Sequence, residues 1–144
     1  MNAELDQSAS PVATRTVKIL VADDHEVMRL GIRNLLESRR DWTICAEAAN
    51  GQEAIEKARE CLPDVIIMDI TMPTMNGLEA ARHIAETHPE IPIILFSLHF
   101  TDDLLTNFGS SIRGAVSKGE AGRDLVEAVQ SVASGGTFFP QKRH

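Results

Sequence analysis

Five short apolar segments alternate with amphipathic segments along this chain, and this alternation restricts the possible folds more than any other feature. Their lengths and their β-branched residues indicate strands. Parallel strands need a long crossover between them, usually a helix, so strand–helix alternation predicts a parallel sheet covered by helices on both faces. The five predicted strands are 17–22 (VKILVA), 42–49 (WTICAEAA), 64–70 (DVIIMDI), 91–98 (IPIILFSL) and 113–118 (RGAVSK).

Apolar residues recur at helical spacing between these strands. Strands 17–22, 64–70 and 91–98 are the most apolar, as expected for central strands buried on both faces. Strand 42–49 contains Glu47 and is typical of an edge. Together these features favour an α/β fold of the flavodoxin-like (βα)5 type, a doubly wound parallel sheet in the order 2-1-3-4-5. The predicted helices are 25–38, 54–62, 78–88, 101–111 and 125–133, the fourth being the least apolar.

The length of 144 residues suits a single domain with a real core. We expect this domain to span 17–138, after a flexible polar tail at 1–16 and before a linker or C-terminal tail at 139–144. The first residues lack the basic start and apolar stretch of a secretory signal. No apolar run approaches the length of a membrane helix. A cytoplasmic protein without a membrane partner is therefore expected.

The formal net charge of −7 argues against direct contact with nucleic acid, because phosphate binding needs clustered Lys and Arg. It suits a domain that binds divalent cations. Cys45 and Cys61 are far apart in the sequence and form no CxxC motif, so we interpret both as small buried thiols.

Polar side chains collect where four of the predicted strands end. Asp23 and Asp24 follow the first strand, Asp69 ends the third, Ser97 ends the fourth and Lys118 ends the fifth. The carboxyl ends of parallel strands meet along one edge of the sheet, which is where ligands bind in this kind of fold. The sequence therefore predicts a site with three carboxylates, one hydroxyl and one ammonium group.

Charge repulsion indicates what this site binds. Three carboxylates at close range raise one another's pKa values unless a small hard cation is shared between them. Mg²⁺ prefers oxygen ligands and sites that also hold phosphate groups. With a lysine and a hydroxyl nearby, the site can neutralise and position a phosphoryl group. Asp69, at the tip of the middle strand, is the candidate nucleophile.

Four segments, VADDHEVMRLGI, VIIMDITMPTMNGLEA, ILFSLH and GAVSKGE, resemble the receiver domain of two-component response regulators, most closely its NarL/FixJ (LuxR-type) subgroup. The resemblance covers residues 17–138. It implies that Asp69 is the phosphoacceptor and that Asp24 binds Mg²⁺ directly. It also implies that Asp23 reaches the metal through water and that the backbone carbonyl of Thr71 is a further metal ligand.

By the same resemblance, Ser97 is the switch hydroxyl and Lys118 pairs with the phosphoryl group. The resemblance implies phosphotransfer from a sensor histidine kinase, homodimer formation on phosphorylation, and slow hydrolysis rather than enzyme turnover. Movement of Ser97 and the fourth helix would then change the output surface. Ala115 stands where the family often has an aromatic switch residue, which removes or replaces that part of the switch.

Family members of this subgroup carry a helix-turn-helix domain after the receiver, so transcription regulation through a DNA-binding domain outside this chain is expected. The alternative is a stand-alone receiver that acts by protein–protein interaction or phosphorelay. A haloacid dehalogenase-type phosphatase would need an acid at Thr71, and a nucleotide binder would need a Gly-rich loop. Taken singly, Asp23 and Asp24 could also be helix caps, Asp69 a turn residue and Lys118 a surface charge.

Overall fold

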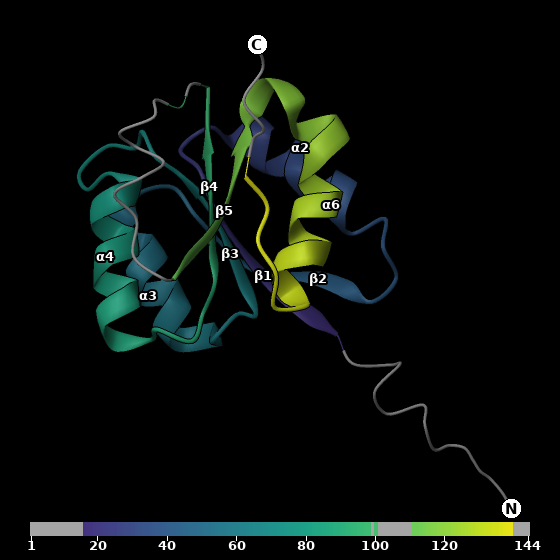
Figure 1. The fold of residues 1–144 in the computed structure, drawn as a ribbon. Coiled ribbons are helices and arrows are strands. Elements are labelled where there is room, and N and C mark those ends of the chain that lie inside the picture. The colour runs from purple at the N-terminus through teal and green to yellow at the C-terminus, as the bar shows by residue number, and fades with distance from the viewer. Residues whose placement is uncertain (1–15, 99, 101–110, 140–144) are drawn as a thin grey trace, which may run out of the picture.

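A computed structural model describes residues 16–98, 100 and 111–139. Its five strands form one parallel sheet in the order β2-β1-β3-β4-β5 (Figure 1). This order confirms the flavodoxin-like prediction, with the mixed strand that contains Glu47 at one edge. The strands are β1 (Val17–Ala22), β2 (Trp42–Ala48), β3 (Val65–Asp69), β4 (Ile93–Ser97) and β5 (Ile112–Ser117).

Helices cover both faces of the sheet. In Figure 1, α3 and α4 lie on one side of the strands and α2 and α6 lie on the other. Among the described residues no helix is long and apolar enough to cross a membrane. The α-helices are α2 (Glu26–Leu36), α3 (Gly51–Cys61), α4 (Gly77–Thr87) and α6 (Ala121–Ala133), and a 3-10 turn, η2 (Lys118–Glu120), links β5 to α6.

The core consists of two apolar layers separated by the sheet. Successive residues of a strand point to opposite faces, so Leu20 and Met68 pack on the α3 and α4 side, while Ile19 and Ile67 pack on the α2 and α6 side. All five residues of β3 are buried. A strand buried on both faces explains the continuous apolar run of this segment, and it makes the carboxylate at its end unusual.

Three of the predicted segments lie partly or wholly outside the described residues. The helix predicted at 101–111 and the tail at 1–16 fall almost entirely there, as does the segment 139–144 apart from Phe139. Ala115 is fully buried in β5 and packs in the α3 and α4 layer. The sheet also gains an addition that was not predicted, because Phe138 pairs with β5 through a bridge to Gly114.

Candidate functional site

The ends of β1, β3 and β5 bring three charged side chains together at one edge of the sheet. Ala22 at the end of β1 is in register with Met68, so Asp23 lies beside Asp69. Lys118 follows β5, two strands further on. Its Nζ lies 3.0 Å from Asp23 Oδ2 and 3.2 Å from Asp69 Oδ2. The structure therefore brings these side chains together, as predicted.

Asp69 is almost completely buried and has contacts on both of its oxygens. Its Oδ1 accepts a hydrogen bond of 3.1 Å from the backbone N–H of Thr71, and its Oδ2 accepts one of 3.2 Å from Lys118 Nζ. Burial raises the pKa of Asp69, as does the charge of Asp23, while Lys118 and the N–H of Thr71 oppose that rise. The net pKa lies above its usual value, so ionised Asp69 lacks full compensation from these neighbours.

Asp23 is fully buried and is held from several directions. Its Oδ1 accepts a 2.8 Å hydrogen bond from the backbone N–H of His25. Its backbone N–H donates to the carbonyl of Ala48, and its own carbonyl accepts from Arg29 Nη1 at 2.5 Å. Asp23 Oδ2 has Lys118 as an ion-pair partner but accepts no aligned hydrogen bond from any described residue. This oxygen has capacity left for a water molecule or a cation.

Lys118 is the cation that faces the buried carboxylates, and only 8% of its side chain is exposed. Burial lowers the pKa of Lys118, but its ion pairs with Asp23 and Asp69 outweigh burial and raise it overall. Its Nζ also lies 5.6 Å from the centre of the Phe96 ring, within the range of a cation–π contact. The ammonium group is therefore charged and fixed in place.

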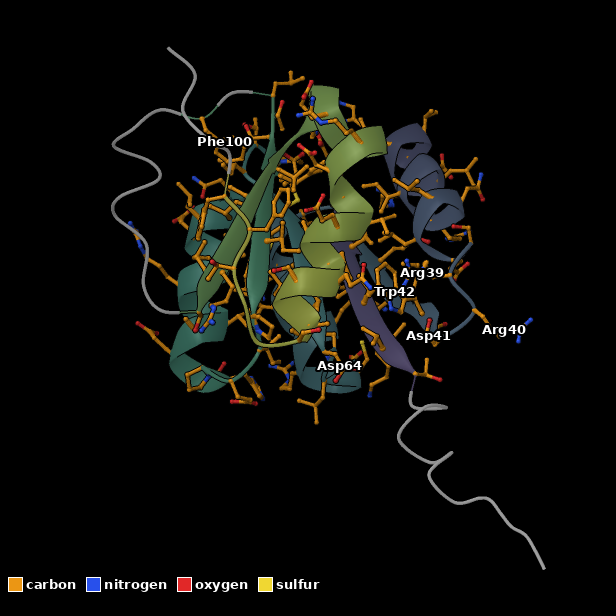
Figure 2. All side chains as sticks on the ribbon, turned by 45° about the vertical axis from the view of Figure 1, so that its right-hand side comes forward. Arg39, Arg40, Asp41, Trp42, Asp64 and Phe100 are labelled. Carbon is orange, nitrogen blue, oxygen red and sulfur yellow. The ribbon has the colours of Figure 1, made fainter. Side chains whose placement is uncertain are left out.

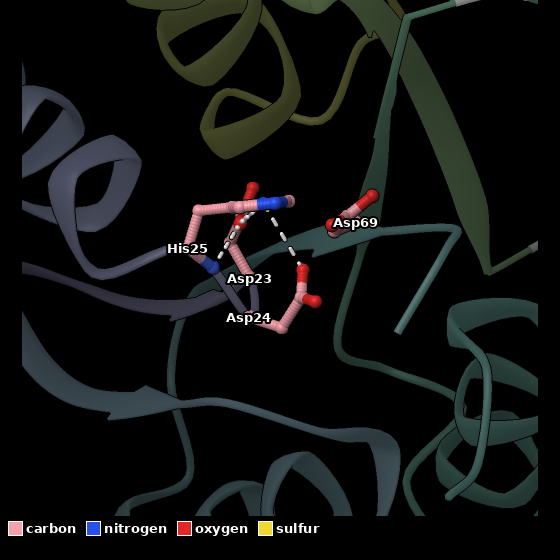
Figure 3. Close-up of side chains that lie close together, drawn as sticks. All are labelled: Asp23, Asp24, His25 and Asp69. Carbon is pink, nitrogen blue, oxygen red and sulfur yellow. Dashed lines mark hydrogen bonds and ion pairs between the residues drawn. The ribbon is translucent and has the colours of Figure 1, made fainter. Parts of the chain in front are cut away.

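Asp24 and His25 complete the cluster on its solvent side. Figure 3 shows Asp23, Asp24 and His25 grouped opposite Asp69. His25 Nδ1 lies 3.1 Å from Asp24 Oδ1 and 3.2 Å from Asp23 Oδ1. One potential ligand atom from each of these four residues lies within 4.8 Å of the others. Three carboxylates against one lysine leave a net negative charge, which is the chemical character of a site for a divalent cation.

His25 follows the acid pair, where the sequence favours a lone exposed histidine at a helix start over a metal ligand, but the structure brings it into the cluster. Its backbone begins α2 as the N-cap, and its ring turns back over the acid pair. Its position directly after Asp24 was the only sequence signal, and adjacency alone does not fix the direction of a side chain at a helix start.

Gly77 is a second contributor that was missed, and it acts through its lack of a side chain. A Cβ at this position would overlap the backbone carbonyl of Asp69. The N–H of Gly77 donates to the carbonyl of Ile70 at 2.8 Å, and the side chain of Asn76 caps α4 by accepting from the N–H of Glu79. The start of α4 therefore packs directly on the backbone that presents Asp69.

Ser97 and Thr71 lie at the same edge of the sheet. Ser97 ends β4, where it is half-buried and in register with Ser117 of β5. Thr71 is exposed in the loop after β3, and its N–H contacts Asp69. The roles predicted for the Ser97 hydroxyl and the Thr71 carbonyl stay predictions.

Comparisons with known proteins show what this chain is similar to. The family described as response regulator receiver domain matches residues 19–130. The chain is 32% identical over 127 residues to the transcriptional regulatory protein DegU of Brevibacillus brevis, covering 88% of this chain and 54% of that protein. It is 37% identical over 124 residues to the response regulator UvrY of Escherichia coli (strain K12), covering 85% and 57% respectively. The chain thus spans little more than half the length of these relatives.

Solved structures show the same fold. A two-component response regulator of the LuxR family from Aurantimonas sp. SI85-9A1 superposes with a TM-score of 0.80 at 35% identity, over 85% of this chain and 89% of that chain. The non-phosphorylated receiver domain of the stress response regulator RcsB from Escherichia coli superposes with a TM-score of 0.78 at 25% identity, over 88% of this chain and all of that one.

Proposed function

This chain belongs to the response regulator receiver family, with relatives of the LuxR and NarL type. From that premise we propose that Asp69 accepts a phosphoryl group from a sensor histidine kinase. The observation that supports this most directly is the buried Asp69 carboxylate, fixed by Lys118 at 3.2 Å inside a cluster of further acids. Packing alone has no need for such a cluster, since each buried charge costs free energy.

The chemistry assigned to Asp69 is a group transfer. One carboxylate oxygen forms a bond to phosphorus while the bond between phosphorus and the histidine nitrogen of the donor breaks, so the phosphoryl group moves without oxidation or reduction. Lys118 neutralises charge on the transferred group, and Ser97 would be its hydroxyl partner. Hydrolysis of the acyl phosphate then returns Asp69 to its carboxylate. The domain would assist both steps without being an enzyme in the usual sense.

The acidic cluster fits Mg²⁺. Asp24 and Asp69 would hold it directly with the carbonyl of Thr71, and Asp23 would reach it through water, for which its buried Oδ2 has capacity. When bound, Mg²⁺ supplies positive charge that offsets the repulsion among the carboxylates and the incoming phosphoryl oxygens. The raised pKa of Asp69 points the same way, because that carboxylate is under-compensated by the protein alone.

Incubation with acetyl phosphate and Mg²⁺ followed by intact-mass measurement tests this function. We expect a gain of about 80 Da, the mass of one phosphoryl group, in the unchanged protein and none in Asp69→Asn or in the presence of a chelator. Equal phosphorylation of Asp69→Asn would overturn the assignment.

Trp42 is a poor reporter of phosphorylation at Asp69. It lies at the start of β2, in register with Val17, while the site follows the other end of β1. Figure 2 shows Phe100, which follows β4, near the top of the molecule and Trp42 well below it.

The output of this receiver domain is proposed for a longer protein that contains it. Relatives such as DegU are named as transcriptional regulators, and this chain covers 54% of that protein. We propose transcription regulation through a separate DNA-binding domain, with a homodimer formed on phosphorylation. A stand-alone receiver working through protein contacts is the alternative. Light scattering with and without beryllofluoride and Mg²⁺ tests the dimer, and a mass that stays monomeric under both conditions would contradict it.

A further inference from the structure

Two thiols lie in contact on the α3 side of the sheet, near the start of β1 rather than at the acidic cluster. Cys45 Sγ and Cys61 Sγ are 2.8 Å apart, and both are free and only half-buried. The prediction of buried thiols is therefore wrong in this respect. A disulfide needs about 2.05 Å between its sulfur atoms, so a small movement of either side chain suffices to join them.

Cys45 faces α3, and a bulge in β2 lies at the same residue. Ile19 pairs with Ile44 and Leu20 pairs with Ala46, which leaves Cys45 as the extra residue. Without the bulge, Ile44 and Ala46 would point to the same face of the sheet. Ile44 instead packs on the α2 side and Ala46 packs on the α3 side. Cys45 follows Ile44 in the strand, so ordinary alternation turns its thiol toward the helix that carries Cys61, and the bulge keeps Ala46 on that side as well.

Lys18 fixes Cys61 from the other side. Its Nζ donates a 2.8 Å hydrogen bond to the carbonyl of Cys61, the last residue of α3. The backbone of Lys18 is held in turn by Asp64, whose N–H donates to the Lys18 carbonyl at 2.7 Å and whose Oδ2 accepts from the Lys18 N–H at 2.8 Å. The end of α3 is therefore tied to β1, and the two thiols are held close by contacts that do not involve sulfur.

A metal does not account for this pair. A structural zinc site needs about four ligands, and the only cluster of three or more His, Cys, Asp or Glu ligand atoms in the described part of the chain is the acidic one. Close, partly exposed thiols without further ligands match the setting of a redox-active pair instead.

We propose that Cys45 and Cys61 are a modification site, forming a reversible intramolecular disulfide when a peroxide oxidises the protein. One sulfur attacks a peroxide oxygen, so a sulfur–oxygen bond forms, the oxygen–oxygen bond breaks and water leaves. The second sulfur then displaces the oxygen, forming the disulfide and releasing a second water. Two thiols and one hydrogen peroxide give one disulfide and two waters, and a dithiol reductant reverses the change.

The contact between the two sulfurs lets either one resolve the other. Burial raises the pKa of Cys45 to about 12, as does its contact with Cys61, while the charge of Lys18 opposes the rise. Because the sulfurs are 2.8 Å apart, a sulfenic acid on one has the other beside it, and the second thiol resolves it as its proton passes to the leaving hydroxide.

Counting thiols in the full chain tests this inference. The reduced protein is treated with about one equivalent of hydrogen peroxide, denatured, and alkylated. We expect two alkylated cysteines before oxidation, none after it, and two again after dithiothreitol. A tryptic digest links peptide 41–57 to peptide 60–82 through the disulfide. The oxidised protein melts about 10 °C higher, because the cross-link restricts the unfolded chain, and dithiothreitol removes the shift.

Two single variants serve as matched controls. In Cys45→Ser and in Cys61→Ser the remaining sulfenic acid has no resolving partner, so dimedone traps it and the linked peptides do not form. Circular dichroism verifies that both variants are folded, and acetyl phosphate labelling verifies that Asp69 chemistry is intact. The inference is overturned if the unchanged protein keeps both thiols, or if its cysteines are oxidised separately without linking the two peptides.

Discussion

At the scale of single residues, Gly77 decides how the phosphoacceptor candidate is presented. Substitution by alanine places a methyl group on the Asp69 carbonyl, so the start of α4 or the end of β3 has to move. We expect Gly77→Ala to lower the free energy of unfolding by about 1–3 kcal/mol, as overpacking does, and to slow phosphorylation of Asp69. Urea unfolding and the intact-mass time course measure the two effects.

Gly31→Ala is the matched control for Gly77→Ala. Gly31 lies inside α2, and a Cβ there meets no atom within 4 Å. This substitution should raise stability by about 0.5–1 kcal/mol, because alanine loses less backbone entropy in a helix. If both variants are equally stable, the close approach of Gly77 to Asp69 has no energetic consequence.

Asp69 itself should limit stability when Mg²⁺ is absent. Its folded pKa is raised by burial and by Asp23, so the ionised carboxylate opposes folding. That cost is absent below the unfolded pKa and appears as the pH rises through the folded pKa. With a chelator at pH 7.5, we expect Asp69→Asn to melt roughly 2–5 °C higher than the unchanged protein, with a gain that shrinks toward pH 4.

Glu56→Gln controls for removal of a negative charge as such. Glu56 is exposed on α3 and should show no comparable gain at either pH. Differential scanning calorimetry at several pH values measures all three proteins. An Asp69→Asn variant that melts at or below the temperature of the unchanged protein at pH 7.5 would contradict the electrostatic account of the site.

At the scale of elements, Arg29 connects three of them at the site. It projects from α2, donates from Nη1 to the carbonyl of Asp23 after β1, and donates from Nε to Glu47 Oε1 of β2 at 3.0 Å. Its side chain is only 16% exposed, so these bonds are shielded from water. Arg33 also pairs with Glu47, but among the described residues it forms no hydrogen bond or ion pair with Asp23. Arg29 is thus a positioning residue for the acid pair.

We expect Arg29→Gln to weaken Mg²⁺ binding about tenfold, the scale on which outer groups affect a metal site. Arg33→Gln should leave the affinity within about twofold, since it loses only an ion pair with Glu47 that is partly exposed to solvent. Isothermal titration with Mg²⁺ measures both, and thermal melting verifies that the variants are folded. Equal losses in the two variants would show that α2 acts through Glu47 rather than through Asp23.

At the scale of the whole molecule, the chain after α6 closes one edge of the sheet. The N–H of Phe138 donates to the carbonyl of Arg113, and the N–H of Ala115 donates to the carbonyl of Phe138. The Phe138 ring packs against the core layer on the α2 and α6 side. Gly114 makes this approach possible, because a Cβ there would lie 2.9 Å from the Phe138 carbonyl oxygen. Unpaired edge strands promote association, so this pairing protects β5.

Phe138→Ala should therefore lower the free energy of unfolding by about 1–3 kcal/mol, a value below that of a fully buried phenylalanine because Phe138 is half-buried. The adjacent Phe139→Ala should cost less than about 0.5 kcal/mol, since Phe139 is exposed. Denaturant unfolding measures both. Similar costs for the two neighbours would mean that the ring of Phe138 adds nothing to the core.

The sequence by itself determined the alternation of strands and helices and the edge at which the charges gather. Both follow from patterns of neighbouring residues, because periodicity sets the element type and parallel strands must end on the same side. Asp23, Asp69 and Lys118 could be assigned to one site for this reason. Asp24 was assigned to the same site in this way, because it follows the same strand as Asp23.

Only the tertiary structure decided contacts that depend on the direction of a side chain or on the distance between two backbones. The turn of His25 over the acid pair, the approach of Gly77 to Asp69 and the pairing of Phe138 with β5 are of this kind. So are the contact between Cys45 and Cys61 and the bulge beside Cys45 in β2. Local sequence patterns repeat every two or 3.6 residues, and a single extra residue that reverses the face of a strand leaves no trace in such a pattern.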